Sequence, residues 1–237
     1  MPETKLSRRL RVAFLLVNGG GRVCDVGTDH ALLPIALVKS GKAKSAIASD
    51  INPKPLEKAR ENIQSEGLEN KIELVLTDGV HGLEGRAEEY VIAGMGGELI
   101  ATIIEQAPFL KNKDVHLVLQ PMTKVSHLRE FLWENGFEIL EEVYLFEAHY
   151  YTVMSVCYQG SSIAFDEIDA LLGKDVENKV LAFDDAVALI GIVKEKLCDF
   201  DKKINGKKLS GQPTEVEEKT YSKLCEILKK LERKYLL

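Results

Sequence analysis

The stretch Arg22-Val23-Cys24-Asp25-Val26-Gly27-Thr28-Asp29-His30-Ala31-Leu32-Leu33-Pro34 decides the fold of this 237-residue chain. A short apolar run that ends in a glycine is typical of an interior strand of a parallel sheet. The residues after the glycine turn predict an apolar helix over 32–40. In open α/β sheets, ligands bind in the crevice beyond the carboxyl ends of the strands. The sequence therefore predicts a binding crevice that holds Asp25, Gly27 and Asp29.

The composition is that of an ordinary globular protein, with 45% apolar and 29% charged residues. At about 100 to 200 residues per domain, the chain has room for one α/β domain and an appendage. No window reaches the ~18 consecutive apolar residues of a membrane span, and no cleavage site follows the basic N-terminal segment. We therefore expect a cytoplasmic protein without membrane association.

Cysteine spacing and net charge restrict the kinds of site and of binding partner that we expect. The four cysteines have no C-x-x-C spacing, and Cys24 and Cys157 lie within apolar strand patterns. This favours buried reduced thiols over a disulfide or a metal site. A net charge of -6 argues against indiscriminate nucleic-acid binding. A local basic face remains compatible with this charge, because phosphate contact depends on where the lysines and arginines lie.

Strand and helix patterns alternate over the first 136 residues. Further strands are expected at 46–51, 72–79, 90–97 and 116–120, and further helices at 52–67, 98–106 and 125–135. This alternation predicts a parallel sheet with right-handed crossovers. Two strand-like runs follow at 137–146 and 150–158, with only three residues between them. Because three residues are too few for a crossover helix, these runs must form an antiparallel hairpin.

The pattern changes after Gln159-Gly160-Ser161-Ser162, which predicts two domains, 1–160 and 161–237. After a short helix at 166–172, apolar residues at spacings of three, four and seven predict two helices of a coiled-coil hairpin. The apolar stripes are Val176, Phe183, Ala186, Ile190, Val193, Leu197 and Phe200, then Tyr221, Leu224, Leu228, Leu231 and Tyr235. We expect a turn at 204–213 and a capping box of Thr214 with Glu217 that opens the second helix.

Basic residues cluster at two places. Lys202, Lys203, Lys207 and Lys208 lie at the expected tip of the helical hairpin, where they are either a solvated turn or an RNA contact. The first helix, over 6–17, has one apolar and one basic face. Its residues Arg8 and Arg9 are either solvated or contact RNA phosphate or a cofactor carboxylate.

The acidic residues of the crevice indicate the kind of cofactor. They are Asp25, Asp29, Asp50 and Asp78. Neither glycine turn has the Gly-x-Gly-x-x-Gly spacing that a dinucleotide pyrophosphate requires. A crevice rich in carboxylates suits the sulfonium cation of S-adenosylmethionine. The alternative is that each acid only caps the helix that follows its strand.

The motifs resemble those of a known family. The pattern of an acid, any residue, glycine and any residue resembles the first motif of the Rossmann-like S-adenosylmethionine-dependent methyltransferases. The whole run from Asp25 to Pro34, together with Gly94-Met95-Gly96-Gly97, resembles the bacterial tRNA methyltransferases that modify N1 of adenine 22. The resemblance covers essentially the whole chain. It implies an α/β fold: a Rossmann-like class I methyltransferase sheet, parallel with a C-terminal antiparallel hairpin, plus a C-terminal α-helical antiparallel coiled-coil domain that binds tRNA.

The resemblance also implies roles for the cofactor-binding residues. Asp50, with Ile51 beside it, corresponds to the acid that binds the ribose hydroxyls of the cofactor. Asp78, with Gly79 beside it, corresponds to the acid near the adenine amino group. Gly27 lets the methionine part of the cofactor approach the backbone, and Gly94 lies in the turn that faces the transferred methyl group.

The turn after the fourth strand indicates which atom of the substrate is methylated. Enzymes that methylate exocyclic amines place an acceptor side chain and an aromatic residue there, and residues 93–97 supply neither. Neutral adenine offers a lone pair at N1, so its methylation needs alignment more than a strong base. We expect Asp29 to be the catalytic residue, since a carboxylate that accepts a hydrogen bond from N6 favours the developing positive charge. His30 and Met95 would shape the base pocket; the alternatives are turn chemistry for Asp29 and helix packing for His30.

The resemblance thus predicts a tRNA (adenine-22-N1)-methyltransferase. Two rival functions stay open: a small-molecule methyltransferase, which would turn over without RNA, and a non-catalytic RNA-binding module, which would not bind the methyl donor. The sequence favours a monomer, although the helical stripes could also pair between chains.

Overall fold

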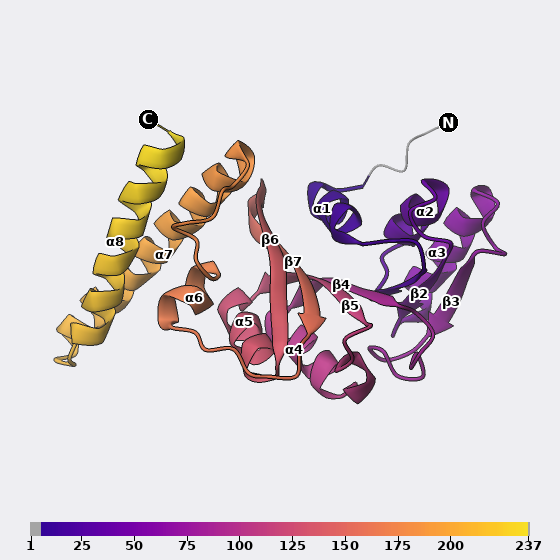
Figure 1. The fold of residues 1–237 in the computed structure, drawn as a ribbon, viewed down its shortest axis with the longest axis horizontal. Helices are drawn as coiled ribbons and strands as arrows, with labels where there is room; N and C mark the ends of the chain where they lie inside the picture. The colour runs from indigo at the N-terminus through magenta and orange to yellow at the C-terminus, as the bar shows by residue number, and fades with distance from the viewer. Residues whose placement is uncertain (1–5, 237) are drawn as a thin grey trace. The chain divides into compact units, whose positions relative to one another are not determined.

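The structure is a computed structural model that describes residues 6–236 (Figure 1). The chain divides into two compact units. The sheet unit runs to Val143 and also includes Tyr151–Ile163. The helical unit comprises Tyr144–Tyr150 and the chain from Ala164 onward. The division after Ile163 lies close to the expected boundary, but the tip of the last hairpin groups with the helices, which the sequence did not predict.

The sheet unit is built on one sheet with the strand order β3-β2-β1-β4-β5-β7-β6. Strands β1 to β5 pair in parallel, and β7 pairs antiparallel with β5. The predicted parallel sheet with a closing antiparallel hairpin is therefore confirmed. The strands are β1 (Arg22–Val26), β2 (Ser45–Asp50), β3 (Ile72–Leu76), β4 (Glu89–Gly96), β5 (His116–Thr123), β6 (Phe137–Glu147) and β7 (His149–Tyr158).

Helices of the sheet unit form two groups. Helix α2 contacts both α1 and α3, and α4 contacts α5. Helices α2 and α3 lead from β1 toward β3, and α4 and α5 lead in the opposite direction along the sheet. Because the crossovers are right-handed, the two groups cover opposite sides of the sheet, as Figure 1 shows. The helices are α1 (Arg8–Leu16), α2 (Leu32–Lys39), α3 (Pro53–Ser65), α4 (Gly97–Glu105), η1 (Pro108–Leu110) and α5 (Val125–Glu134).

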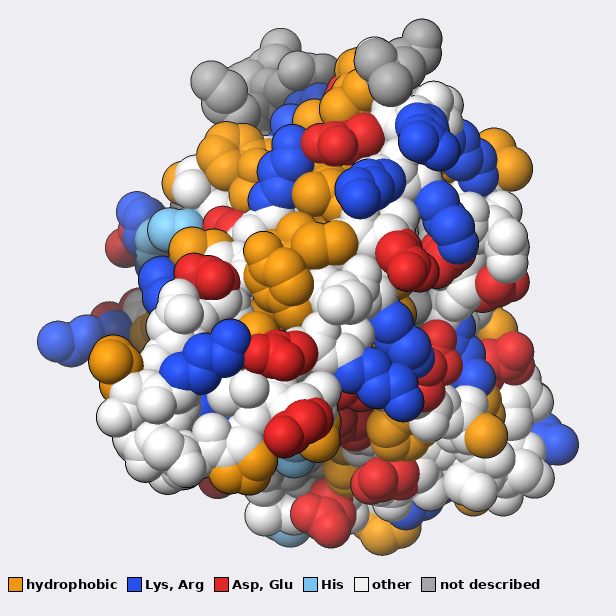
Figure 2. Space-filling model, turned by 90° about the vertical axis from the view of Figure 1, so that its left-hand side faces the viewer, with side chains coloured by type: hydrophobic (Ala, Val, Ile, Leu, Met, Phe, Trp, Pro, Cys, Tyr) orange, Lys and Arg blue, Asp and Glu red, His pale blue; other side chains and the backbone are white. Residues whose placement is uncertain are grey.

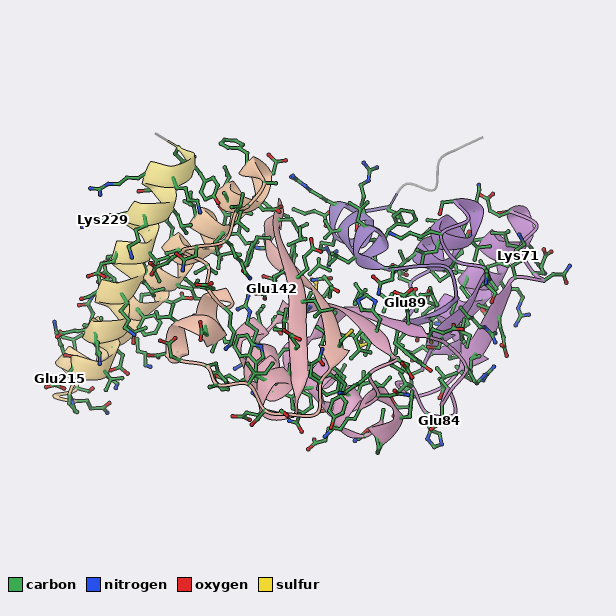
Figure 3. All side chains as sticks on the ribbon, in the orientation of Figure 1. Lys71, Glu84, Glu89, Glu142, Glu215 and Lys229 are labelled. Atoms are coloured by element: carbon green, nitrogen blue, oxygen red, sulfur yellow. The ribbon has the colours of Figure 1, made fainter. Side chains whose placement is uncertain are left out.

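A buried polar cluster ties the start of β1 to the middle of the sheet. The carboxylate of Glu89 accepts hydrogen bonds from the backbone N–H groups of Asn18 and Gly19, at 2.7 and 2.6 Å. It also lies 2.7 Å from Nδ1 of His116, whose Nε2 lies 2.8 Å from Oγ of Ser155. Figure 3 marks Glu89 inside the sheet unit. Since every partner is buried or backbone, this cluster fixes the loop between α1 and β1.

The strand β5 is longer than the sequence indicated. It continues through Pro121 to Thr123, where the pattern predicted an end at residue 120. The extension follows from β4, because Met95 pairs with Pro121 and Gly96 with Thr123 beyond an irregularity at Gly94. Proline is tolerated in a strand where the ladder is interrupted in this way.

The helical unit contains α6 (Glu167–Leu172), α7 (Phe183–Leu209) and α8 (Glu215–Tyr235). Its core includes Leu189, Val193, Leu224 and Leu231, all at most 1% exposed. Most of the predicted stripe residues face this core. Two do not fit the predicted helix: Val176 is buried but precedes α7, and Phe183 is 62% exposed at the first turn.

The predicted turn at 204–213 is wrong, because α7 continues to Leu209. Ile204 is buried, and Lys207 reaches Glu217 of α8 at 2.7 Å. These contacts outweigh the low helix propensity of Asn205 and Gly206. Consequently, Lys202, Lys203, Lys207 and Lys208 lie on the last turns of a helix and not in a loop.

The predicted capping box at Thr214 is also wrong. Thr214 makes no side-chain cap; its hydroxyl donates to Oε1 of Glu218, and Glu217 instead pairs with two lysines of α7. A capping box does occur at α6, where Asp166 and Asp169 exchange hydrogen bonds. Among residues 6–236, no helix is long and apolar enough to cross a bilayer.

Candidate functional site

A cavity of about 460 Å³ opens at the carboxyl ends of β1, β4 and β5. Five of the predicted site residues, Arg9, Asp25, Gly27, Asp29 and Gly94, line it. The first turn of α1 and its N-cap line another part of the wall. The remaining lining residues are Ser7, Leu10, Leu32, Leu33, Ala93, Gln120 and Met122.

Asp25 is the buried acid of this cavity, with 6% of its surface exposed. Its Oδ2 accepts a 2.6 Å hydrogen bond from Oγ1 of Thr28. Burial raises the pKa of Asp25 to about 6; the Thr28 hydrogen bond opposes this rise, and the charges of Asp29 and Asp50 add to it. A cation in the cavity would favour the ionised carboxylate, so Asp25 is suited to a positively charged ligand.

The turn after β1 holds Asp29 at the mouth of the cavity. Gly27 has φ of +71°, and the next two residues before α2, His30 and Ala31, also have positive φ, of 60° and 56°. Such a conformation is costly for residues other than glycine and is often found at functional sites. It is supported by a 2.9 Å hydrogen bond from Nδ2 of Asn62 to the carbonyl of His30. The turn leaves the Asp29 side chain 80% exposed, with Oδ1 3.3 Å from Nε2 of His30.

The β4 turn approaches the β1 turn across one edge of the cavity. A Cβ atom added at Gly27 would lie 2.2 Å from Cε of Met95. The positive φ favours glycine at position 27, and a side chain there would also have to displace the flexible end of Met95. This places Met95, a predicted base-pocket residue, beside the turn that carries Asp29 and His30.

Arg9 is the basic residue that the structure brings into the cavity. Its Nη1 lies 2.7 Å from the sulfur of Met122, and its guanidinium carbon lies 4.8 Å from the ring centroid of Tyr151. Arg8, the neighbouring residue, is exposed and does not line the cavity. The cavity thus carries carboxylates on one wall and a guanidinium on another.

Four predicted cofactor residues lie outside this cavity. Asp50 ends β2, and its Oδ1 accepts a 2.7 Å hydrogen bond from the backbone N–H of Asn52, the N-cap residue of α3; Ile51 is 58% exposed. Asp78 and Gly79 line a separate cavity of about 250 Å³. Their roles toward a cofactor stay predictions.

The four lysines of α7 lie in the helical unit. Three of them pair with acids of α8: Lys203 and Lys207 reach Glu217 at 3.0 and 2.7 Å, and Lys208 reaches Glu218 at 2.8 Å. Hydrogen bonds from Lys207 and Lys203 lower the pKa of Glu217 to about 2. Figure 2 shows lysine and arginine side chains interspersed with acidic ones on the face it presents. Lys203, Lys207 and Lys208 therefore help to join α7 to α8.

Sequence reasoning missed Ser7, Gln120 and Met122 in the cavity wall. Gln120 could have been found, because it is the one polar residue that ends an otherwise apolar run, the signal that identified Asp25 and Asp50. Ser7 and Met122 carry no such signal. Within the described part of the chain, no group of three or more His, Cys, Asp or Glu residues is placed to hold a metal ion.

Comparison with known proteins places the chain in a family. The model of the methyltransferase domain family matches residues 6–154. A curated tRNA (adenine(22)-N(1))-methyltransferase of Bacillus subtilis is 36% identical over 148 residues, which are 62% of this chain and 62% of that protein. The chain thus spans less than two thirds of this curated relative.

Solved structures match over greater length. The crystal structure of the B. subtilis M1A22 tRNA methyltransferase TrmK is 27% identical with a TM-score of 0.77, covering 98% of this chain and 99% of that one. A Streptococcus pneumoniae protein solved in complex with S-adenosyl-L-methionine is 29% identical with a TM-score of 0.80, covering 94% of this chain and all of that one. The resemblance drawn from the motifs is confirmed, and the chain belongs to the methyltransferase domain family.

Proposed function

We propose that the chain transfers a methyl group from S-adenosylmethionine to N1 of adenine 22 in tRNA. The names of its relatives support this substrate and this cofactor. The observation that carries the proposal is that one cavity is lined by a buried acid, Asp25, and an exposed acid, Asp29. The β4 turn beside this cavity offers no acceptor side chain.

The charges of the cavity fit S-adenosylmethionine. This cofactor has a sulfonium and an ammonium cation and one carboxylate, and it supplies an electrophilic methyl group when bound. Asp25 and Asp29 would face the cations, and Arg9 would face the carboxylate. Gly27 and Gly94 present backbone without side chains to the same space. We further propose that the predicted cofactor residues outside the cavity bind the rest of the cofactor along the sheet edge. Asp50 and Ile51 would bind the ribose, and Asp78 and Gly79 would bind the adenine.

Asp29 would orient the target base. Its exposed carboxylate can accept a hydrogen bond from the N6 amino group of adenine and stabilise the positive charge that develops on the ring. No proton has to be removed from N1, so the chain needs to supply alignment more than basicity. His30 and Met95, which flank Asp29 and Gly27, would shape the pocket that holds the ring.

The target base must leave its stack to reach the cavity, at a cost of a few kcal/mol. We infer that contacts to the rest of the tRNA offset this cost, from Arg8 on α1 and from the lysines of α7. In this proposal residues 1–160 form the methyltransferase domain, residues 161–237 form the tRNA-binding domain with coiled-coil packing, and the protein acts as a cytoplasmic monomer.

The test is single-turnover methyl transfer from labelled S-adenosylmethionine to an unmodified tRNA transcript, with the product nucleoside identified by mass spectrometry. The wild-type protein should form 1-methyladenosine. Asp29→Ala should slow transfer by about 100-fold, the size expected when one electrostatic contact to the transition state is lost. Asp29→Asn, which keeps an acceptor oxygen, should be slowed less. The control is Asp114→Ala, an exposed acid in the loop before β5.

Each alternative gives a different result. A small-molecule methyltransferase would transfer the label in the absence of RNA. A non-catalytic module would form no product and bind no S-adenosylmethionine. Formation of N6-methyladenosine, or an Asp29→Ala variant as fast as the wild type, would contradict the proposed mechanism.

A further inference from the structure

The strand β4 is irregular where it reaches the cavity. Its pairing with β5 is regular from Glu89 to Ala93, then passes from Ala93–Gln120 to Met95–Pro121, so that Gly94 is left without a partner in the register. Gly94 has φ of +79°. One extra residue in a strand bends it locally and redirects the side chains that follow. The irregularity therefore determines where the Met95 side chain points.

Gln120 satisfies the backbone group that the irregularity exposes. Its Oε1 accepts a 3.1 Å hydrogen bond from the backbone N–H of Gly94. Its Nε2 donates at 3.0 Å to the carbonyl of Pro121. The side chain is 2% exposed, and both ends of its amide are occupied, so it has a single fixed orientation.

The redirected Met95 closes against the β1 turn. A Cβ atom at Gly27 would lie 2.2 Å from Cε of Met95, so the methionine methyl group rests on the bare backbone of that glycine. Gly27 belongs to the turn that carries Asp29, and Gly94 and Gln120 line the same cavity. A chain of contacts thus runs from Gln120 through Gly94 and Met95 to Gly27.

We propose that Gln120 is a positioning residue, which holds the irregularity at Gly94 so that Met95 seats on Gly27 and the two glycine turns keep a fixed separation across the cavity. Gln120 acts through Met95 and not on the substrate directly. The kinetic part of this inference rests on the proposed methyl transfer. The structural part does not, because it concerns a contact within the chain.

The structural part is tested by NMR with ¹³C-methyl-labelled methionine. The chain has four methionines, so the Met95 signal can be assigned by substitution. The wild type should show a nuclear Overhauser effect between the Met95 methyl group and the Gly27 α-protons. Gln120→Leu should abolish this effect while the Met154 signal, from the sheet core, stays in place. Gln120→Glu, which in its protonated form keeps both an acceptor for the Gly94 N–H and a donor for the Pro121 carbonyl, should retain it.

The kinetic part is tested by a double-mutant cycle on the single-turnover rate. Gln120→Leu and Met95→Ala should each slow methyl transfer by about 100-fold, the loss expected from a misplacement near 1 Å. Because the two residues act in series, the double variant should be no slower than the slower single variant, whereas independent effects would multiply. Gln64→Leu, an exposed glutamine on α3, is the matched control and should keep the wild-type rate.

Two results would overturn the inference: a Met95–Gly27 contact that persists in Gln120→Leu, or losses that multiply in the double variant. If the wild type transfers no methyl group to tRNA, the proposed function fails, and the NMR measurement still decides whether Gln120 positions Met95.

Discussion

Oγ1 of Thr28 donates a 2.6 Å hydrogen bond to Oδ2 of Asp25; both residues are almost fully buried, and Asp25 lines the cavity. Thr28 is itself held by a 2.8 Å hydrogen bond from its backbone N–H to the carbonyl of Ser49 on β2. The acid is thus oriented by the same turn that exposes Asp29. Its burial has consequences that can be measured.

Asp25 should make stability depend on pH. Burial raises the pKa of Asp25 from 3.8 to about 6, so between these values the folded protein binds a proton that the unfolded chain has released. The free energy of unfolding should therefore fall between pH 4 and pH 6 and level off above, by roughly 3 kcal/mol in total. Asp25→Asn should lack this contribution. Denaturant unfolding of both proteins from pH 4 to pH 8 measures the difference, and parallel curves would contradict it.

Asp25 should also make the affinity for S-adenosylmethionine depend on pH, and this affinity should rise with pH where the stability falls. A bound cation favours the ionised carboxylate, so affinity for S-adenosylmethionine should rise with pH up to about 6 and then stay constant. Calorimetric titration at several pH values measures this. Asp25→Asn should bind more weakly at pH 7 and show a flatter profile; a wild-type affinity that does not change below pH 6 would show that Asp25 does not face the cation.

Glu89→Gln should destabilise the sheet unit. Burial tends to raise the pKa of Glu89, but hydrogen bonds from His116 and from the backbone of Gly19 and Asn18 outweigh burial and lower it. The ionised form is thus the one that the fold stabilises, and this stability is lost as the pH falls through the lowered pKa. Replacing the carboxylate by an amide leaves one of its buried N–H partners without an acceptor, at a cost of about 1 to 3 kcal/mol. Urea unfolding at pH 7 measures the loss.

The control for Glu89 is Glu88→Gln, an exposed neighbour whose carboxylate also accepts a backbone hydrogen bond, from Arg22 at 2.7 Å. Its effect should be much smaller, because the exposed group can exchange the lost partner for water. Equal losses in the two variants would show that the buried cluster contributes no more than a surface contact.

The lysines of α7 should contribute to tRNA affinity through charge. Lys202 is exposed and Lys208 makes an exposed ion pair, so both can be replaced without disturbing the inter-helix contacts of Glu217. In the double variant Lys202→Ala/Lys208→Ala, tRNA binding should weaken. The negative slope of log affinity against log salt concentration should become less steep by roughly one to two. Filter binding at several salt concentrations measures both quantities.

Lys71→Ala, an exposed lysine of the sheet unit before β3, is the control for this prediction and should leave the slope unchanged. If the slope is also unchanged in the double variant, the end of α7 does not contact the tRNA.

The arrangement of the sheet could be predicted from the sequence because each signal is local. Apolar runs such as Val23–Val26 are too short for helices, and a three-residue link at 147–149 permits only a hairpin. The order of strand, turn and helix then places Asp25, Gly27 and Asp29 at one sheet edge, where they line the cavity.

The errors arose where contacts between distant residues override local preference. Asn205-Gly206 predicts a turn, yet the burial of Ile204 and the Lys207–Glu217 pair extend α7 past it. The register irregularity at Gly94, which gives Gln120 its partner, likewise depends on pairing between β4 and β5. Neither the sequence of β4 nor that of β5 indicates it alone.

The most direct test of the account is to map the methylated position. Wild-type protein, S-adenosylmethionine and an unmodified tRNA carrying adenine 22 are incubated, and the product is analysed by reverse transcription, which methylation at N1 blocks because it occupies the pairing edge of the base. The account predicts one new stop at position 22, absent without the cofactor and absent from a transcript with guanine at that position. A stop elsewhere, or no stop while the label enters the RNA, would contradict it.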